Sequence, residues 1–330
     1  DKFNRVIGSY KNGAYDTLPV AGKSLELTID DDLQSYGEIL MQCKRGSIVA
    51  IEPKSGEILA LVSAPSYDPN LLVGRKRSQN YTLLYNDSIA KPLFDRALLA
   101  EYPPGSTFKP FTALLGLQEG VMTPQSVVAC NGGYHYGNRV MKCHAHASPL
   151  DMLHAIATSC NAYFAHEYRK IIEKYPTPAQ GITAWGNDLR SFGFGEYLGS
   201  DFPIGRKGYI PDAAFYNRHY GENGWRATTN ISNGIGQGEV LVTPLQLANA
   251  LSAIANKGDY YTPHIVRKID GKTTPFTQYT EVKHTRVASQ YFDLIIKGMN
   301  LSYTGGTSRG TQIDSVNVAA KTGTAENYIR

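Results

Sequence analysis

Residues 102–109 read YPPGSTFK and place a serine and a lysine directly after a strong turn signal. An apolar run follows over residues 111–117 and predicts a helix that ends at Gly120. Ser106 would lie in the first turn of this helix, where free N–H groups favour developing negative charge. Lys109, three residues later, faces the same side. Burial beside a second cation would lower the pKa of Lys109, so we predict that neutral Lys109 is the general base for Ser106.

A second serine motif is formed by Ser159, Cys160 and Asn161, on a segment that we predict to be helical. The Ser159 hydroxyl is a candidate relay for a proton to a leaving group. The side-chain amide of Asn161 is a candidate ligand for a substrate peptide carbonyl. Alone, this tripeptide would indicate no more than an ordinary helix surface.

A third motif, KTGT at residues 321–324, follows a predicted strand over residues 316–320. Lys321, Thr322 and Thr324 offer a cation and two hydroxyls, a set that suits a substrate carboxylate. Gly323 lets a ligand approach the strand backbone closely. The N–H groups of Thr324 and Ser106 would together form an oxyanion hole.

The order of the predicted elements indicates an α+β fold. Alternation over residues 25–29 predicts a strand, and Asp30 caps the helix that follows. Two apolar runs over residues 46–62 flank a Pro-Lys-Ser-Gly turn and predict a β-hairpin covered by helices on both faces. Amphipathic helices are predicted at residues 150–168 and 243–256. We therefore expect an antiparallel sheet covered by helices, with an all-helical insert subdomain.

Composition excludes several classes of protein. Hydrophobic residues make up 42% and charged residues 19% of the 330-residue chain, which is typical of a globular protein with a sizeable core. The formal net charge of +4 is mild and no basic block with interleaved aromatics is present, so no nucleic-acid partner is expected. No apolar run reaches the roughly 18–20 residues that span a bilayer.

The three motifs S-x-x-K, S-x-N and K-T-G, in this order, are the signature shared by penicillin-binding proteins and serine β-lactamases. Residues 92–109 and the hairpin at 46–62 resemble class B penicillin-binding proteins. Aromatic residues within 215–225 and the glycine-rich segment 234–238, followed by 242–246, resemble the elongation-type members, known as penicillin-binding protein 2.

The resemblance implies a penicillin-binding/serine β-lactamase-like transpeptidase fold and a peptidoglycan D,D-transpeptidase of cell-wall elongation. Ser106 would attack a D-Ala-D-Ala stem peptide, and β-lactams would stall the enzyme at the acyl stage. No cofactor is expected for catalysis. The expected partners of the full-length protein are a SEDS-family glycosyltransferase and an elongation scaffold. The expected location is the periplasm, with an anchor in the inner membrane through an N-terminal helix absent from this chain.

Two related activities remain as alternatives, a D,D-carboxypeptidase and a non-hydrolysing β-lactam sensor. A class A β-lactamase is disfavoured, because the chain lacks the E-x-x-L-N context of the Glu that activates the deacylating water.

We expect residues 1–23 to be a linker or a remnant of a pedestal domain, and residues 24–330 to form the transpeptidase domain. Its sheet subdomain would comprise about 24–100 and 312–330, and its helical and loop subdomain about 101–311. The resemblance also implies further C-terminal strands that are missing here.

Three cysteines flank the S-x-N motif, and two histidines lie among them. They are Cys130, Cys143, Cys160, His144 and His146. Three thiols and one imidazole are a known composition of structural zinc sites. Some elongation-type homologues carry a metal at this place, and by that resemblance the ligand set is the three cysteines with His146, or with His144 as the alternate. A Cys130–Cys143 disulfide and free thiols are the other interpretations.

Overall fold

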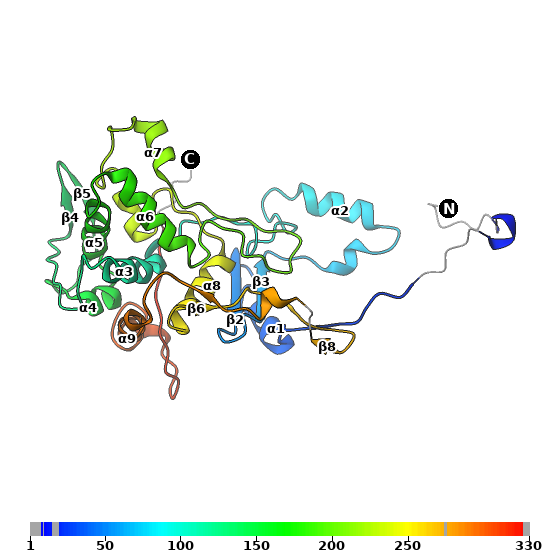
Figure 1. Cartoon of the computed structure of the whole chain (residues 1–330). Coiled ribbons are helices and arrows are strands. Elements are labelled where there is room, and N and C mark those ends of the chain that lie inside the picture. The colour runs from blue at the N-terminus through cyan, green and yellow to red at the C-terminus, as the bar shows by residue number, and fades with distance from the viewer. Residues whose placement is uncertain (1–7, 9, 15–19, 274–275, 326–330) are drawn as a thin grey trace.

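The computed structural model describes residues 8, 10–14, 20–273 and 276–325. Its helices are α1 (Asp31–Leu40), α2 (Arg77–Asn86), α3 (Lys109–Gln118), α4 (Met152–Thr158), α5 (Asn161–Glu173), α6 (Pro178–Arg190), α7 (Ala213–Tyr220), α8 (Pro244–Ala255) and α9 (Phe292–Thr304). Its strands are β1 (Leu25–Leu27), β2 (Gly46–Ile51), β3 (Ile58–Ala64), β4 (Gly133–Tyr136), β5 (Arg139–Lys142), β6 (Asp259–Tyr260), β7 (Val266–Ile269), β8 (Lys272–Thr273) and β9 (Lys283–His284). The 3-10 turns are η1 (Tyr10–Gly13), η2 (Pro69–Leu72), η3 (Gly105–Phe108), η4 (Ile231–Ile235), η5 (Thr277–Tyr279), η6 (Ser289–Tyr291) and η7 (Arg309–Thr311). Figure 1 shows α3 to α6 and α9 gathered at one end and the β2–β3 hairpin near the middle.

The predicted hairpin is confirmed as β2 and β3, which pair antiparallel from Gly46 opposite Ala64. Alternate side chains of β3 are buried, and α1 packs against this strand while α8 packs against β2. A Cβ added at Gly37 of α1 would lie 2.8 Å from a methyl of Val62, which shows how closely the helix covers the strand. The predicted cap of α1 is also confirmed, because the Asp30 carboxylate accepts a hydrogen bond from the helix.

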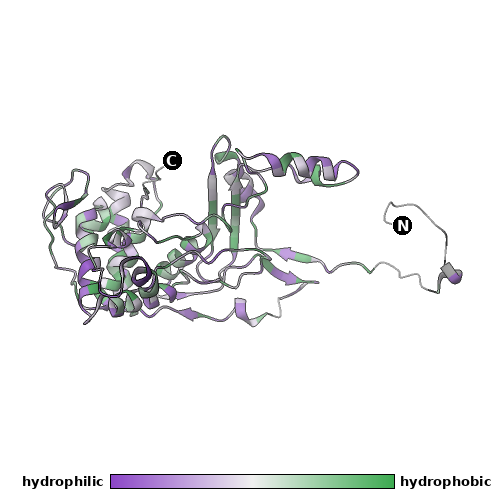
Figure 2. Ribbon diagram, turned by 90° about the horizontal axis from the view of Figure 1, so that it is seen from above, coloured by the Kyte–Doolittle hydropathy of each residue, from purple (hydrophilic) through white to green (hydrophobic). Residues whose placement is uncertain are grey.

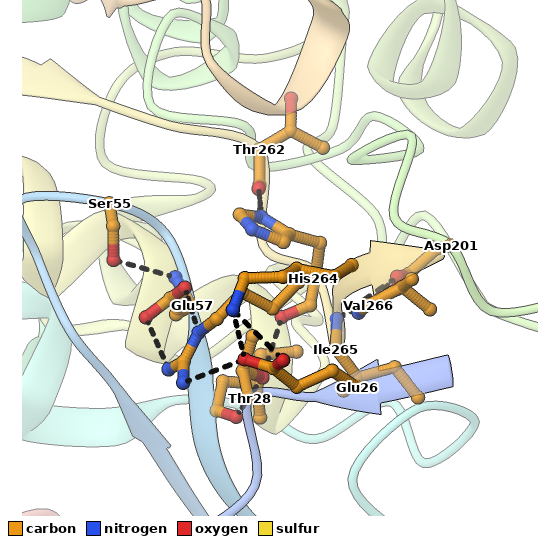
Figure 3. A network of polar contacts seen from close by, with 12 residues as sticks. Glu26, Thr28, Ser55, Glu57, Asp201, Thr262, His264, Ile265 and Val266 are labelled. Carbon is orange, nitrogen blue, oxygen red and sulfur yellow. Dashed lines mark hydrogen bonds and ion pairs between the residues drawn. The ribbon is translucent and has the colours of Figure 1, made fainter. Parts of the chain in front are cut away.

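A polar network joins the N-terminal strand region to the rest of the fold (Figure 3). The Glu57 carboxylate makes two hydrogen bonds of 2.8 and 2.9 Å with the Arg267 guanidinium of β7, and this contact lowers the pKa of Glu57. The Asp201 carboxylate accepts from the backbone N–H groups of Ile265 and Val266 at 2.8–3.0 Å. The residues around β7 are therefore fixed by charge-assisted hydrogen bonds from two different segments.

The insert is mainly helical, but it is not all-helical as predicted. The strands β4 and β5 pair as a hairpin, with Gly137 in a left-handed conformation (φ 55°) at its turn. On β4 the rings of Tyr134 and Tyr136 stack, with centroids 6.1 Å apart. These alternating aromatics and the Gly-Asn turn are a hairpin signal that the sequence-based interpretation overlooked.

The prediction of a strand over residues 316–320 is wrong for the described residues. The segment from 312 to 325 forms no strand, and the Val316 side chain is about half exposed, so its apolar alternation buries little. Helix α9 supplies the hydrogen-bond partners instead. The Ala320 N–H donates to the Met299 carbonyl (3.1 Å), and the Asn300 side-chain amide donates to the Val318 carbonyl (3.0 Å).

Figure 2 shows both apolar and polar stretches along the helices. Among the described helices, none combines the length and the apolar composition needed to cross a membrane. The predicted linker over residues 1–23 falls largely outside the described residues, and so do residues 326–330.

Candidate active site

Ser106 lies in the η3 turn, which continues directly into α3, so the prediction of a helix start at this serine is confirmed. The turn is fixed by its own backbone: the Thr107 hydroxyl donates to the Pro104 carbonyl (2.7 Å), and the Lys109 N–H donates to the Ser106 carbonyl. Phe108 and Lys109 are buried, whereas Ser106 is only half-buried. The serine therefore remains accessible on a rigid support.

The Lys109 side chain links the first two motifs. Its Nζ donates to the Ser159 carbonyl oxygen (2.6 Å), the Ser159 hydroxyl (3.1 Å) and the Asn161 Oδ1 (2.7 Å). The side chain is fully buried, and this burial lowers the pKa of Lys109 to about 8. A substantial neutral fraction near physiological pH follows, as a general base requires.

The S-x-N motif lies at a break between two helices, not on one continuous helix as predicted. Ser159 has a left-handed conformation (φ 59°, ψ 42°) and ends α4, and Cys160 is the N-cap of α5. A continuous helix would commit the Ser159 carbonyl to the helical ladder. At the break, both the carbonyl and the hydroxyl of Ser159 are free to meet Lys109.

The KTGT segment lies against the serine turn. A Cβ added at Gly323 would come within 2.8 Å of the Thr107 methyl, and one at Gly105 would clash with the Thr324 carbonyl. Only glycine lets these two backbones meet so closely. The structure therefore brings together segments that are separated by more than 200 residues in sequence.

Lys321 is the second cation of the site. Its Nζ donates to the Thr322 carbonyl (3.0 Å), and the Thr322 hydroxyl donates to the Thr307 hydroxyl (2.8 Å). Burial first, and the nearby charge of Lys109 second, lower the pKa of Lys321 to about 7. All the residues predicted for catalysis and substrate binding thus gather at one place.

Gly236 contacts the serine turn, and the sequence-based interpretation did not assign this residue to the site. Its carbonyl accepts from the N–H of Gly105 at 2.7 Å, directly before the serine. A Cβ at Gly236 would lie 2.5 Å from the Cβ of Phe108. The signal was present in the spaced glycines of residues 234–238, which are typical of close backbone approach.

The predicted metal ligands form a compact cluster beside S-x-N. The Sγ atoms of Cys130, Cys143 and Cys160 and a ring nitrogen of His146 all lie within 4.8 Å of one another. His144 is not in the cluster, and its Nε2 lies 2.7 Å from the carbonyl of Thr158. All described cysteines are free, so the structure contains no Cys130–Cys143 disulfide.

The cluster favours one thiolate. A hydrogen bond from the Cys160 thiol, with a further bond from the Asn161 N–H (3.1 Å), lowers the pKa of the Cys143 thiol. The same pairing and burial raise the pKa of Cys160. His146 places Nε2 3.3 Å from the Cys143 sulfur, while its Nδ1 lies 2.7 Å from the Ala147 carbonyl. A ligating histidine commonly has its second nitrogen fixed in this way.

Comparison with known proteins identifies the family and the fold. The sequence model described as penicillin binding protein transpeptidase domain matches residues 46–329. Peptidoglycan D,D-transpeptidase MrdA of Acinetobacter baumannii is 34% identical over 324 residues, which cover 93% of this chain and 45% of that protein. The chain thus spans about half the length of the curated relatives it matches.

Two solved structures are similar over most of the chain. PBP2 of Pseudomonas aeruginosa in complex with WCK 5153 is 34% identical, with a TM-score of 0.82 over 93% of this chain and 69% of that one. PBP2 of Helicobacter pylori in its complex with MreC is 27% identical, with a TM-score of 0.79 over 92% of this chain and 54% of that one. These similarities confirm the resemblance to penicillin-binding protein 2, and the chain belongs to the penicillin-binding protein transpeptidase family.

Proposed function

We propose that this chain is the catalytic domain of a serine D,D-transpeptidase that cross-links peptidoglycan stem peptides and is acylated by β-lactams. The observation that carries the proposal is the buried Lys109 amine, bonded to the S-x-N motif and three residues from an accessible serine on a rigid turn. A serine nucleophile needs a general base near it, and Lys109, with its lowered pKa, lies about one helical turn from Ser106.

In the proposed reaction, Lys109 takes the proton of the Ser106 hydroxyl as its oxygen attacks the penultimate D-Ala carbonyl. The bond from that carbonyl to the nitrogen of the terminal D-Ala breaks, and the leaving amine receives a proton through the Ser159 hydroxyl. An amine of a neighbouring stem peptide then attacks the Ser106 ester. A new amide forms and Ser106 regains its proton.

The other residues bind the substrate. We assign the terminal carboxylate to Lys321 with the hydroxyls of Thr322 and Thr324, and the oxyanion to the N–H groups of Ser106 and Thr324. Removing one donor of an oxyanion hole typically costs about 2.7–4 kcal/mol of transition-state stabilisation. Gly323 allows the close approach of this segment to Thr107.

Intact mass measurement with benzylpenicillin tests the proposal. We expect a long-lived adduct that peptide mapping places on Ser106 and that is absent from Ser106→Ala. An adduct that forms and then disappears would indicate a hydrolase. A D-Ala-D-Ala peptide with an amine acceptor separates the remaining activities: cross-linked product supports the transpeptidase, hydrolysed product a carboxypeptidase, and neither product a sensor.

We also propose that the full-length protein acts outside the inner membrane with an elongation scaffold and a SEDS-family glycosyltransferase. The solved complex of Helicobacter pylori PBP2 with MreC supports the scaffold. Co-purification of the full-length protein with both partners tests this assignment, and their absence from a cross-linked preparation would contradict it.

We further propose that Cys130, Cys143, His146 and Cys160 hold a structural zinc ion. Tetrahedral zinc with Zn–S bonds of about 2.3 Å places its ligand atoms roughly 3.8 Å apart, which agrees with a cluster that lies within 4.8 Å. Bound zinc would fix Cys160 between Ser159 and Asn161 and so stabilise the helix break.

Metal analysis and thermal unfolding test the zinc site. We expect about one zinc per chain, and a fall in melting temperature after treatment with a chelator. His146→Ala should lose the metal, whereas His144→Ala is the matched control that should retain it. The site would be disproved if the purified protein contained no metal and if the chelator left its melting temperature unchanged.

A further inference from the structure

Glu239 carries an acidic side chain that the proposed reaction does not use. It is half-buried, and no cation pairs with it among the described residues. Its Oε2 accepts a hydrogen bond of 2.6 Å from the hydroxyl of Tyr216, a buried residue of α7. The carboxylate is thus directed into the protein, against a buried phenol.

Asn233 closes a ring of hydrogen bonds with this pair. Its Nδ2 donates to the Tyr216 hydroxyl (2.8 Å), and its Oδ1 accepts from the Glu239 backbone N–H (3.3 Å). Asn233 is fully buried and also donates to the Tyr168 hydroxyl of α5 (3.4 Å). Because each member holds the next, the loss of one leaves a buried polar group without its partner.

The ring is hydrogen-bonded, through Gly236, to the turn that supports the nucleophile. The Gly236 N–H donates to the Asn233 carbonyl (3.0 Å), and the Gly236 carbonyl accepts from the Gly105 N–H (2.7 Å). Gly105 immediately precedes Ser106 and is pressed against Thr324 on its other side. A shift of Asn233 would therefore be transmitted through two backbone hydrogen bonds to Ser106.

The proposed base has hydrogen-bond partners of its own. Lys109 is bound to Ser159 and Asn161 at the break between α4 and α5, and no hydrogen bond to the Asn233 ring is among its contacts. The η4 turn also meets α5, through Asn233 and Tyr168, so the distance between nucleophile and base depends on the Gly236–Gly105 hydrogen bond as well as on the bonds of Lys109. A displacement of about 1 Å in such a pair can lower a rate by roughly 100-fold.

We propose that Glu239, through Tyr216 and Asn233, is a positioning residue that sets Ser106 relative to its base during acylation. The inference rests on the proposed function, since it assumes that Ser106 is the nucleophile. Glu239 would act without touching the substrate, so its removal would slow the chemical step and leave binding unchanged.

Saturation kinetics of acylation by a fluorescent penicillin test this role, because they separate the limiting rate constant from the half-saturation concentration. We expect Glu239→Ala and Tyr216→Phe each to lower the limiting rate constant by about tenfold, with half-saturation within about twofold of wild type. Glu239→Gln should restore most of the rate, since its amide oxygen can still accept from Tyr216. Glu222→Ala is the matched control, because Glu222 is an exposed glutamate in the loop after α7.

The double variant Glu239→Ala/Tyr216→Phe decides whether the two residues act as one unit. We expect it to be no slower than Tyr216→Phe alone, since Tyr216→Phe has already removed the hydrogen bond that Glu239→Ala removes. Tyr216→Phe keeps the ring volume, and the melting temperature of each variant shows that it is folded. Effects that multiply, or a change confined to half-saturation, would overturn the proposal. If wild type is not acylated at all, the proposed function fails. If wild type is acylated and Glu239→Ala reacts as fast as wild type, the inference alone fails.

Discussion

One buried lysine, Lys109, and one half-buried lysine, Lys321, share one site, and their charges have different tasks in the proposed reaction. Lys109 needs to be neutral to accept the Ser106 proton, whereas Lys321 needs its charge to hold a carboxylate. Burial lowers the pKa of Lys109 to about 8, and burial together with the charge of Lys109 lowers that of Lys321 to about 7. The neutral form of each lysine dominates above its pKa.

We therefore predict that a rise in pH speeds the chemical step of acylation but weakens binding. The limiting rate constant should rise with pH, with a midpoint near the pKa of about 8 of Lys109. The half-saturation concentration should increase as the pH rises above the pKa of Lys321, about 7, because Lys321 then loses its charge. Lys321→Arg keeps a permanent charge and should remove only the second effect. A limiting rate constant that is flat or falls between pH 6 and 9 would contradict the assignment of Lys109.

At the scale of elements, the sequence predicted the parts of the site that rest on local signals. The Pro-Pro-Gly turn, the Asp30 cap and the β2–β3 hairpin are confirmed because each depends on neighbouring residues. The helix break at Ser159 was missed because left-handed serine has no strong local signature, and its partner Lys109 is 50 residues away. Tertiary contact overrode helical propensity there.

For the segment 316–320, in contrast, the sequence predicted an element that the structure does not form. Its alternation predicted a strand, but a strand requires a neighbour that supplies hydrogen bonds, and none pairs with it among the described residues. Asn300 and the Met299 carbonyl supply them from α9. Alternation alone therefore could not decide the conformation of this segment, although the adjoining KTGT motif was correctly expected to come close to the serine turn.

The backbone contact of Gly105 allows a test of how closely the η3 turn packs on the KTGT segment. Gly105 and Gly120 both have positive φ, 58° and 66°, but only Gly105 faces another backbone, that of Thr324. Gly120→Ala should cost about 1 kcal/mol of stability and leave acylation intact, because it adds conformational strain alone. Gly105→Ala should destabilise more and slow acylation at least tenfold, since its Cβ forces the turn and the KTGT segment apart. Thermal unfolding and acylation rates that are equal for the two variants would refute the contact.

Across the whole molecule, most buried polar groups are paired, and Glu167 on α5 is an exception. Its side chain is fully buried, and neither carboxylate oxygen has a hydrogen-bond partner among the described residues. It packs against Gly116 of α3, and burial raises the pKa of Glu167 well above its usual value. Burial therefore favours the protonated form of this carboxyl in the native state.

The sign of the pH effect on stability follows from that raised pKa. Below the unfolded-state pKa of about 4.5 both states hold the proton, and Glu167 makes no pH-dependent contribution. As pH rises, the unfolded state loses its proton first, so the free energy of unfolding falls by at most about 1.4 kcal/mol per pH unit until the native pKa is reached. We predict that Glu167→Leu removes this pH-dependent fall in the free energy of unfolding. The melting temperature of the variant should therefore exceed that of wild type by an amount that grows from pH 5 to pH 8. Glu173→Gln, at the exposed end of the same helix, should change the melting temperature little at either pH. An advantage for Glu167→Leu that shrinks with rising pH would mean that the native state holds Glu167 ionised.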